Sequence, residues 1–363
     1  MATSSTAELA AAKPPHSGGK LHSAAKLLGV ALLVPLAVAG MLSLFAWPSA
    51  NLEPRDLPLG VAGPAQATDA LSTKLEQASD GGFEIHRYAD EAAARSAIED
   101  REVYGAIVTA PDGITLLTAS AASPLVAQLL TQAVTTPDGP LAGAGAGAQT
   151  GADTQTGADT QAGGNAPAPP KVVDVVPTTR DDPRGTVLSV AVLPLVFAGL
   201  ATGIATFVAS RPGLAQATGL LVTSALAGVA AVWVAQEWLG ALGGDWWVNA
   251  GAIGLTVLAI SATVAGLGAA IGPAGLGLAA VLMMFVGNPF SGVASAPELL
   301  PSWVGVTGQF LPPGAGGSLL RSTAFFDSAA VTQPGFVLVG WVVLGLACGL
   351  IGVRRHRIAR TTT

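Results

Sequence analysis

The sequence has few charged residues, few aromatic residues and a single cysteine. Only 11% of its 363 residues are charged, whereas about a quarter is usual in soluble globular proteins, and half are hydrophobic. Lipid is therefore the expected solvent for much of the chain. The lone cysteine, Cys348, excludes a disulfide within the chain, so any domain outside the membrane must be stabilised by its own hydrophobic core.

The sequence also lacks the groupings from which catalytic, metal and nucleotide sites are built. Its four histidines, His16, His22, His86 and His356, are scattered and have no ligand spacing. There is no Gly-x-x-x-x-Gly-Lys-Ser/Thr loop to bind nucleotide phosphates, and no Ser/His/Asp or Cys/His arrangement compatible with the spans below. We therefore expect a protein that is not an enzyme, with no cofactor, no metal site and no nucleic-acid partner.

Long hydrophobic runs dominate what is present. Crossing a bilayer takes about 20 mostly apolar residues, and six candidate spans cover residues 27–47, 186–210, 213–234, 248–267, 273–286 and 335–353. The first could also be a signal peptide, but it is about twice as long as a usual apolar signal region, so we expect an uncleaved anchor. The fifth has only about fourteen apolar residues. It either starts earlier, near Ile271, or continues into a re-entrant segment after Asn288.

Lys and Arg near the span ends predict the orientation. Arg180 and Arg184 oppose the assignment, but they end a long loop, where charge has less influence. With six spans all the other clusters fall on one face, whereas five spans would place one cluster outside. We expect a multi-pass protein of the inner (plasma) membrane, with the tails 1–26 and 354–363 in the cytoplasm. The basic residues that support this are Lys13, Lys20, Lys26, Arg211, Arg354, Arg355, Arg357 and Arg360.

Residues 48–185, between the first two spans, predict an extracytoplasmic α/β domain, because strand-like and helix-like stretches alternate. A repeated Thr-Gly-Ala-Asp-Thr-Gln within residues 137–170 predicts a disordered insertion. The fold class is thus a membrane all-α bundle of six transmembrane helices, with re-entrant elements before the last, plus a small α/β domain. Its strands are expected at 57–61, 83–88, 103–109, 113–117 and 171–176, and its helices at 66–78, 90–98 and 123–133.

Residues 287–333, within the bundle 186–353, form the predicted re-entrant or outer segment. Candidate gate and turn residues there are Gly287, Asn288, Pro289, Gly292, Pro312, Pro313, Gly314 and Arg321. Gly and Pro interrupt helices whatever the function, which favours a structural role. Arg321 could pair with Glu298 or Asp327, and a structural ion pair is favoured over a substrate contact. Glu237, at the outer edge of the third span, is a candidate polar group in lipid, although a solvated helix end is the favoured interpretation.

Several segments together resemble a known family. Residues 90–98, Asp-Glu-Ala-Ala-Ala-Arg-Ser-Ala-Ile, and 103–108, Val-Tyr-Gly-Ala-Ile-Val, resemble the external domain of bacterial type-2 permeases of the ABC transporter class and of related phage-infection-protein-like membrane proteins. The layout of one span, an outer domain and five further spans agrees. The Gly/Ala-rich insertion and the short outer domain depart from the family. Further segments that fit are 174–177, 182–185, 287–292, 298–301, 311–315, 320–321 and 325–327.

The resemblance implies the permease subunit of an exporter, which moves a hydrophobic or amphipathic substrate across the bilayer. It also implies a homo- or heterodimer of permease chains and a separate ATP-binding subunit that supplies the energy. The alternative is a membrane-anchored receptor or envelope scaffold that acts through its extracytoplasmic domain.

Overall fold

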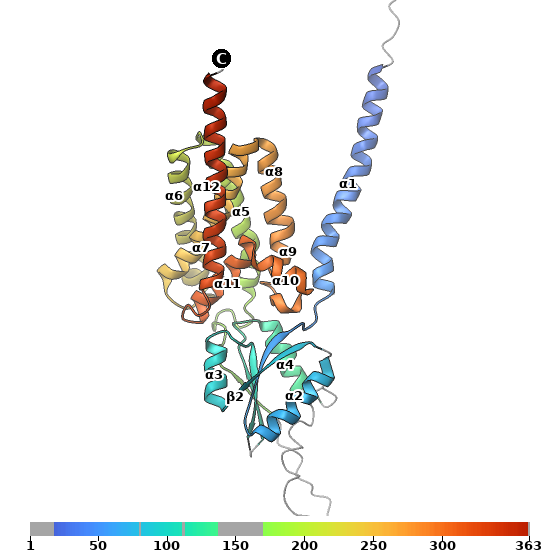
Figure 1. Ribbon diagram of the computed structural model, residues 1–363, viewed down its shortest axis with the longest axis vertical. Helices are drawn as coiled ribbons and strands as arrows, with labels where there is room; N and C mark the ends of the chain where they lie inside the picture. Colours follow the sequence, from blue (N-terminus) through green and yellow to red (C-terminus); the bar gives the residue numbers. More distant parts are fainter. Residues whose placement is uncertain (1–17, 80, 111–112, 137–169, 362–363) are drawn as a thin grey trace, which may run out of the picture. The chain divides into compact units, whose positions relative to one another are not determined.

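The computed structural model describes residues 18–79, 81–110, 113–136 and 170–361 (Figure 1). The chain divides into two compact units, Met1–Trp47 and Pro48–Thr363. The first contains most of the long helix α1 (Gly18–Ala50), and the second contains all the other elements. The predicted disordered insertion, 137–170, lies outside the described residues except for its last position.

Five helical segments are long and apolar enough to cross a membrane, which indicates a multi-pass membrane protein. The predicted first span lies within α1, and among the residues that the structure describes its apolar helical segment is Pro35–Ala50. Six crossings therefore stay a prediction. The five segments are α5 (Thr186–Ala209), α6 (Leu214–Val232) with the π-helix η2 (Trp233–Trp238), α7 (Trp246–Ile271), α8 (Pro273–Val281) with the π-helix η3 (Leu282–Gly287) and α9 (Asn288–Phe290), and α12 (Thr332–Thr361).

The fifth span is longer in the structure than the sequence predicts. The chain turns at Gly272, whose φ of +74° ends α7, so the span does not start near Ile271. Instead, α8, η3 and α9 form one 18-residue apolar segment, Pro273–Phe290. The π-helical turn carries the helix past Asn288, where the sequence predicts an interruption.

Helix α7 is the central helix of the bundle, because it packs against α5, α6 and α12 at sites where one partner is glycine. A Cβ at Gly228 of α6 would lie 2.3 Å from the carbonyl oxygen of Ala250, and one at Gly345 of α12 would lie 2.4 Å from the carbonyl carbon of Ala262. Small residues allow such close approach of backbones where lipid removes most of the hydrophobic driving force between helices. The glycine-rich composition therefore has a structural use in this bundle.

The α/β domain is a five-stranded sheet in the order β2-β1-β3-β4-β5, with helices on both faces (Figure 1). β1 pairs in parallel with β2 and β3, β3 and β4 form an antiparallel hairpin, and β5 pairs in parallel with β4. Helices α2 and α4 pack on one face and α3 on the other. The elements are β1 (Leu57–Ala62), α2 (Ala65–Ser79), β2 (Phe83–Tyr88), α3 (Glu91–Glu99), β3 (Gly105–Ala110), β4 (Gly113–Thr118), α4 (Pro124–Thr135) and β5 (Lys171–Asp174).

Three short helices connect α9 to α12. They are the 3₁₀-helix η4 (Pro297–Leu299), α10 (Ser302–Gln309) and α11 (Pro312–Phe325). Nearly every residue of α11 is buried, although the helix is too short to span a bilayer. This segment corresponds to the predicted re-entrant region, and its depth in a membrane stays a prediction.

Candidate functional site: the junction of the α/β domain and the bundle

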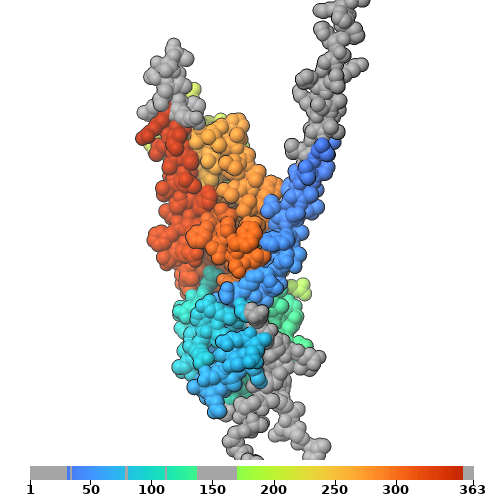
Figure 2. All heavy atoms as spheres, turned by 45° about the vertical axis from the view of Figure 1, so that its right-hand side comes forward, coloured from blue at the N-terminus to red at the C-terminus, as the bar shows by residue number. Residues whose placement is uncertain are grey.

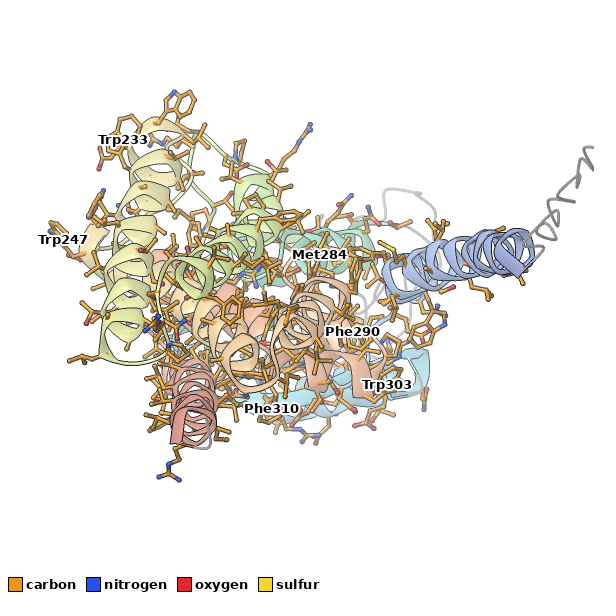
Figure 3. The ribbon with its side chains drawn as sticks, turned by 90° about the horizontal axis from the view of Figure 1, so that it is seen from above. Trp233, Trp247, Met284, Phe290, Trp303 and Phe310 are labelled. Atoms are coloured by element: carbon orange, nitrogen blue, oxygen red, sulfur yellow. The ribbon has the colours of Figure 1, made fainter. Side chains whose placement is uncertain are left out.

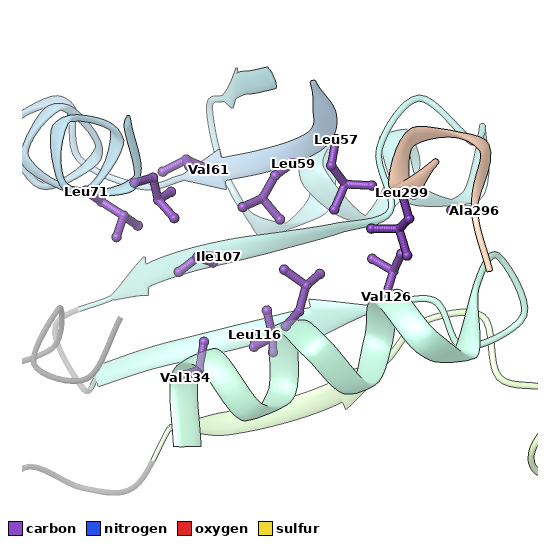
Figure 4. Packing of buried hydrophobic residues seen from close by; sticks show 12 residues of the cluster. Leu57, Leu59, Val61, Leu71, Ile107, Leu116, Val126, Val134, Ala296 and Leu299 are labelled. Atoms are coloured by element: carbon purple, nitrogen blue, oxygen red, sulfur yellow. The ribbon is translucent and has the colours of Figure 1, made fainter. Parts of the chain in front are cut away.

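The α/β domain shares its hydrophobic core with the segment that connects α9 to α12. Leu299 is fully buried in a cluster with Leu57 and Leu59 of β1 and Val126 of α4 (Figure 4). The Ser123 hydroxyl, at the N-terminus of α4, donates a hydrogen bond to the carbonyl oxygen of Ser295. Figure 2 shows the α/β domain in contact with the helical bundle along the molecular surface. The domain is therefore built into this end of the bundle.

A second contact involves Arg101, which follows α3 and has a left-handed backbone with φ of +62°. Its guanidinium donates hydrogen bonds to the carbonyl oxygen of Ser318, at 3.1 Å, and to the hydroxyl of Ser322, at 2.5 Å. It also lies over the ring of Phe326, 5.3 Å from the centroid. The C-terminal half of α11 is the negative end of that helix dipole, which favours a cation at this place.

Tyr104 and Glu298 form a polar contact beside Arg101. The Tyr104 hydroxyl donates to Oε2 of Glu298 at 2.7 Å. Burial raises the pKa of Tyr104 well above its ordinary value, and the Glu298 carboxylate raises this pKa further. The phenol therefore stays protonated at physiological pH and serves as the donor.

Arg321, on α11, is the most deeply buried charge of the junction, with 3% of its surface exposed. One Nη donates to the carbonyl oxygen of Val293 at 2.8 Å, whereas Nε is buried and has no hydrogen-bond partner. Burial lowers the pKa of Arg321 to about 10, and the nearby Arg101 lowers it too, so the side chain stays cationic at neutral pH. The predicted ion pair with Glu298 or Asp327 is wrong, because within the described residues neither carboxylate lies within 4.0 Å of this guanidinium.

The structure brings some of the predicted gate residues together. A Cβ on Gly287 would lie 2.8 Å from Cγ of Pro313, so the end of η3 contacts the start of α11. The backbone turns at Gly292, whose φ is +65°. Pro312 and Pro313 begin α11, where proline is well tolerated, and the following Gly314 packs on the backbone of Gly308.

The remaining predicted positions lie apart from this contact. Asn288 and Pro289 are partly exposed within the continuous fifth helical segment, and they do not form a turn there. Glu237 is exposed in η2, as expected of a solvated helix end.

A hydrogen-bond chain links the junction to three helices of the bundle. Ser318, whose carbonyl accepts from Arg101, donates its hydroxyl to Oε1 of Gln309 at 2.6 Å. Gln309 in turn donates to the carbonyl of Ser291, at the end of α9, at 2.8 Å. Trp341 of α12 donates to the carbonyl of Phe310 at 2.8 Å. Hydrogen bonds therefore connect Arg101 through α11 and α10 to the end of α9, and the end of α10 to α12.

The sequence indicated Arg321 and Glu298 as candidates but not Arg101. Arg101 lies between Asp100 and Glu102, a pattern typical of a solvated loop. The buried amide of Asn249 was also missed. It donates to Oε1 of Gln236 at 3.0 Å and to the carbonyl of Gly243 at 2.7 Å, while its own Oδ1 has no hydrogen-bond partner. A lone amide within a long apolar run was the available signal for it.

Comparison with models of protein families, with curated proteins and with solved structures gives no match. The fold and the junction alone therefore define the class of protein. It is a multi-pass membrane protein in which an α/β domain is packed onto one end of a bundle of apolar helices.

Proposed function

We propose that the chain is the permease subunit of an ABC-type exporter, which moves a hydrophobic or amphipathic substrate with energy from a separate ATP-binding subunit. One observation carries the proposal most directly. The core of the α/β domain is completed by Ala296, Leu299 and Phe326, which belong to the connection between α9 and α12. A movement of the bundle helices would therefore move the outer domain as well, as a transport cycle that couples the two parts requires.

The proposal includes an orientation and an assembly. Helix α1 is the first of six spans, both chain ends are cytoplasmic in the inner (plasma) membrane, and two permease chains form a homo- or heterodimer. The aromatic side chains near the outer ends of the spans support this depth in the lipid. Trp238 and Trp247 are 71% and 72% exposed, and Trp247 points away from the bundle in Figure 3. Tryptophan prefers the membrane–water interface.

In this orientation the ATP-binding subunit binds the cytoplasmic connections. The turn between α5 and α6 is one of them, and it presents the exposed Arg211. The chain has no phosphate-binding loop of its own, so the energy must come from the partner.

The test is to purify the tagged full-length chain in a mild detergent, identify the co-purifying proteins by mass spectrometry and assay ATP hydrolysis. We expect one ATP-binding protein in stoichiometric amount. Arg211→Glu should reduce its recovery by repulsion or loss of contact, whereas the matched exposed control Arg180→Glu, at the other end of α5, should not. Recovery of the chain alone, with no ATP hydrolysis, would contradict the proposal.

The alternative function is a membrane-anchored receptor or envelope scaffold, and one observation favours it. Strand β2 is an edge of the sheet, and two of its residues, Glu84 and Arg87, are exposed. Such an edge can pair with a strand of a partner protein. Under this alternative, deleting the α/β domain abolishes function, and the pull-down yields an envelope protein in place of an ATPase.

A further inference from the structure

We propose that Arg321 binds the negatively charged headgroup of the transported compound, so that the substrate class is an amphipathic monoanion, such as a long-chain carboxylate or a phosphodiester. This inference rests on the proposed function, because it takes the bound compound to be the transported one. The binding site itself is argued from the charges and contacts of the junction.

Positive charge exceeds negative charge at the junction. Two guanidiniums, Arg101 and Arg321, lie near a single carboxylate, Glu298, and that carboxylate accepts a hydrogen bond from Tyr104. Among the residues that the structure describes, neither arginine has an ion-pair partner within 4.0 Å. A buried charge is strongly unfavourable unless it is paired. One negative charge would restore neutrality at this site.

The Arg321 side chain also has a buried donor without an acceptor. Its Nε is buried and has no hydrogen-bond partner, while an Nη is bound to Val293. An arginine presents Nε and a neighbouring Nη as a planar fork that matches two oxygens of a carboxylate or phosphate. The Nη beside Nε already donates to Val293, so Nε is the donor that remains for an oxygen of a carboxylate or phosphate.

Helix α10, which packs against α11, carries exposed apolar side chains. Gln309 of α10 accepts from Ser318, one turn before Arg321 on α11. Val306 of α10 is 60% exposed, and Phe310, which is labelled in Figure 3 and follows α10, is 57% exposed. In this proposal the hydrocarbon chain of an amphipathic molecule, whose headgroup binds Arg321, would lie along this apolar surface of α10.

The experiment measures binding to the purified full-length chain in a neutral maltoside detergent, through the thermal unfolding midpoint read by tryptophan fluorescence. The probes are decanoate, decanol as the matched neutral compound, and acetate and chloride as free anions. We expect decanoate, but not decanol, to raise the midpoint in a saturable way. Acetate and chloride should require concentrations at least on the order of tenfold higher, since they lack the hydrocarbon chain.

Two variants with opposite expected effects separate binding from folding. Arg321→Gln should weaken decanoate binding on the order of tenfold or more, because it removes a charged donor. Glu298→Gln removes the competing negative charge and should strengthen binding, which a merely unfolded variant does not do. Arg95→Gln, on the exposed surface of α3, is the matched control and should bind as the wild type does.

The inference is overturned if decanol protects as well as decanoate, or if neither variant changes the decanoate affinity. It is also overturned if chloride or acetate raises the unfolding midpoint as effectively as decanoate does and this effect requires Arg321. The site then binds a free anion and not the headgroup of an amphipathic compound. None of these results depends on an ATPase, so a failed pull-down with intact decanoate binding overturns the permease proposal alone.

Discussion

The contribution of Leu299 to the α/β domain can be tested directly. This residue lies in the second half of the chain, but it belongs to the hydrophobic core of a domain that the first half forms. In Leu299→Ala the cavity would open against Leu57, Leu59 and Val126. Leu299 is fully buried, and leucine-to-alanine changes at such sites destabilise by 2–5 kcal/mol. We expect about 3 kcal/mol, which corresponds to a roughly 100-fold increase in the equilibrium for local opening.

Amide hydrogen exchange measured by mass spectrometry is the appropriate assay, since it reports the stability of β1 and α4 separately from that of the membrane helices. Exchange in Leu57–Ala62 should become faster by the same factor of roughly 100. The control is Leu226→Ala on α6, where the side chain is 62% exposed. If the exchange of β1 is the same in both variants, the domain is independent of the α9–α12 connection and the shared core is not a coupling element.

Three further changes test other parts of the structure. Tyr104→Phe should flatten the pH dependence of the melting temperature above pH 10. The pKa of Tyr104 is raised in the folded state, so the stabilisation from this residue is complete below the unfolded pKa of about 10 and is lost as the pH rises through the folded pKa. Gly345→Ala should lower thermal stability by about 1–3 kcal/mol through overpacking against α7, whereas Gly349→Ala, where an added Cβ meets nothing within 4 Å, should match the wild type. Asp182→Ala removes the acceptor for the amides of Thr186 and Val187 and should destabilise the start of α5 by about 1 kcal/mol, seen as faster amide exchange there.

Local patterns in the sequence predicted most of the α/β domain. β2 occupies the predicted residues 83–88, where side chains alternate with period two. Asp90 caps α3 by accepting from the amide of Ala93 at 2.9 Å, as its position before an Ala-rich stretch indicated. The hairpin of β3 and β4 follows from the turn residues between them. Each of these features depends on neighbours in the sequence.

The junction could not be predicted in the same way, because its members are distant in the sequence. Ala296 and Leu299 read as part of a Pro-rich connection, and nothing local indicates that they complete the core of a domain near residue 57. Arg321 was recognised as unusual, yet its predicted ion pair was wrong because Val293 takes one donor and the Glu298 carboxylate bonds Tyr104. The extent of the fifth span was missed because a π-helix maintains helical structure across Gly287.

The shared core also constrains how the protein is made. Arg55, at the start of the α/β domain, hydrogen-bonds the carbonyl of Leu299, which is 244 positions later in the chain. At a synthesis rate of roughly 5–20 residues per second, on the order of ten to fifty seconds separate the two partners. During that interval β1 and α4 are outside the ribosome without the residues that cover one end of their core. The domain therefore reaches its final stability only after the connection between α9 and α12 has been delivered, and truncation before residue 299 should leave an exposed apolar surface that quality-control proteases can recognise.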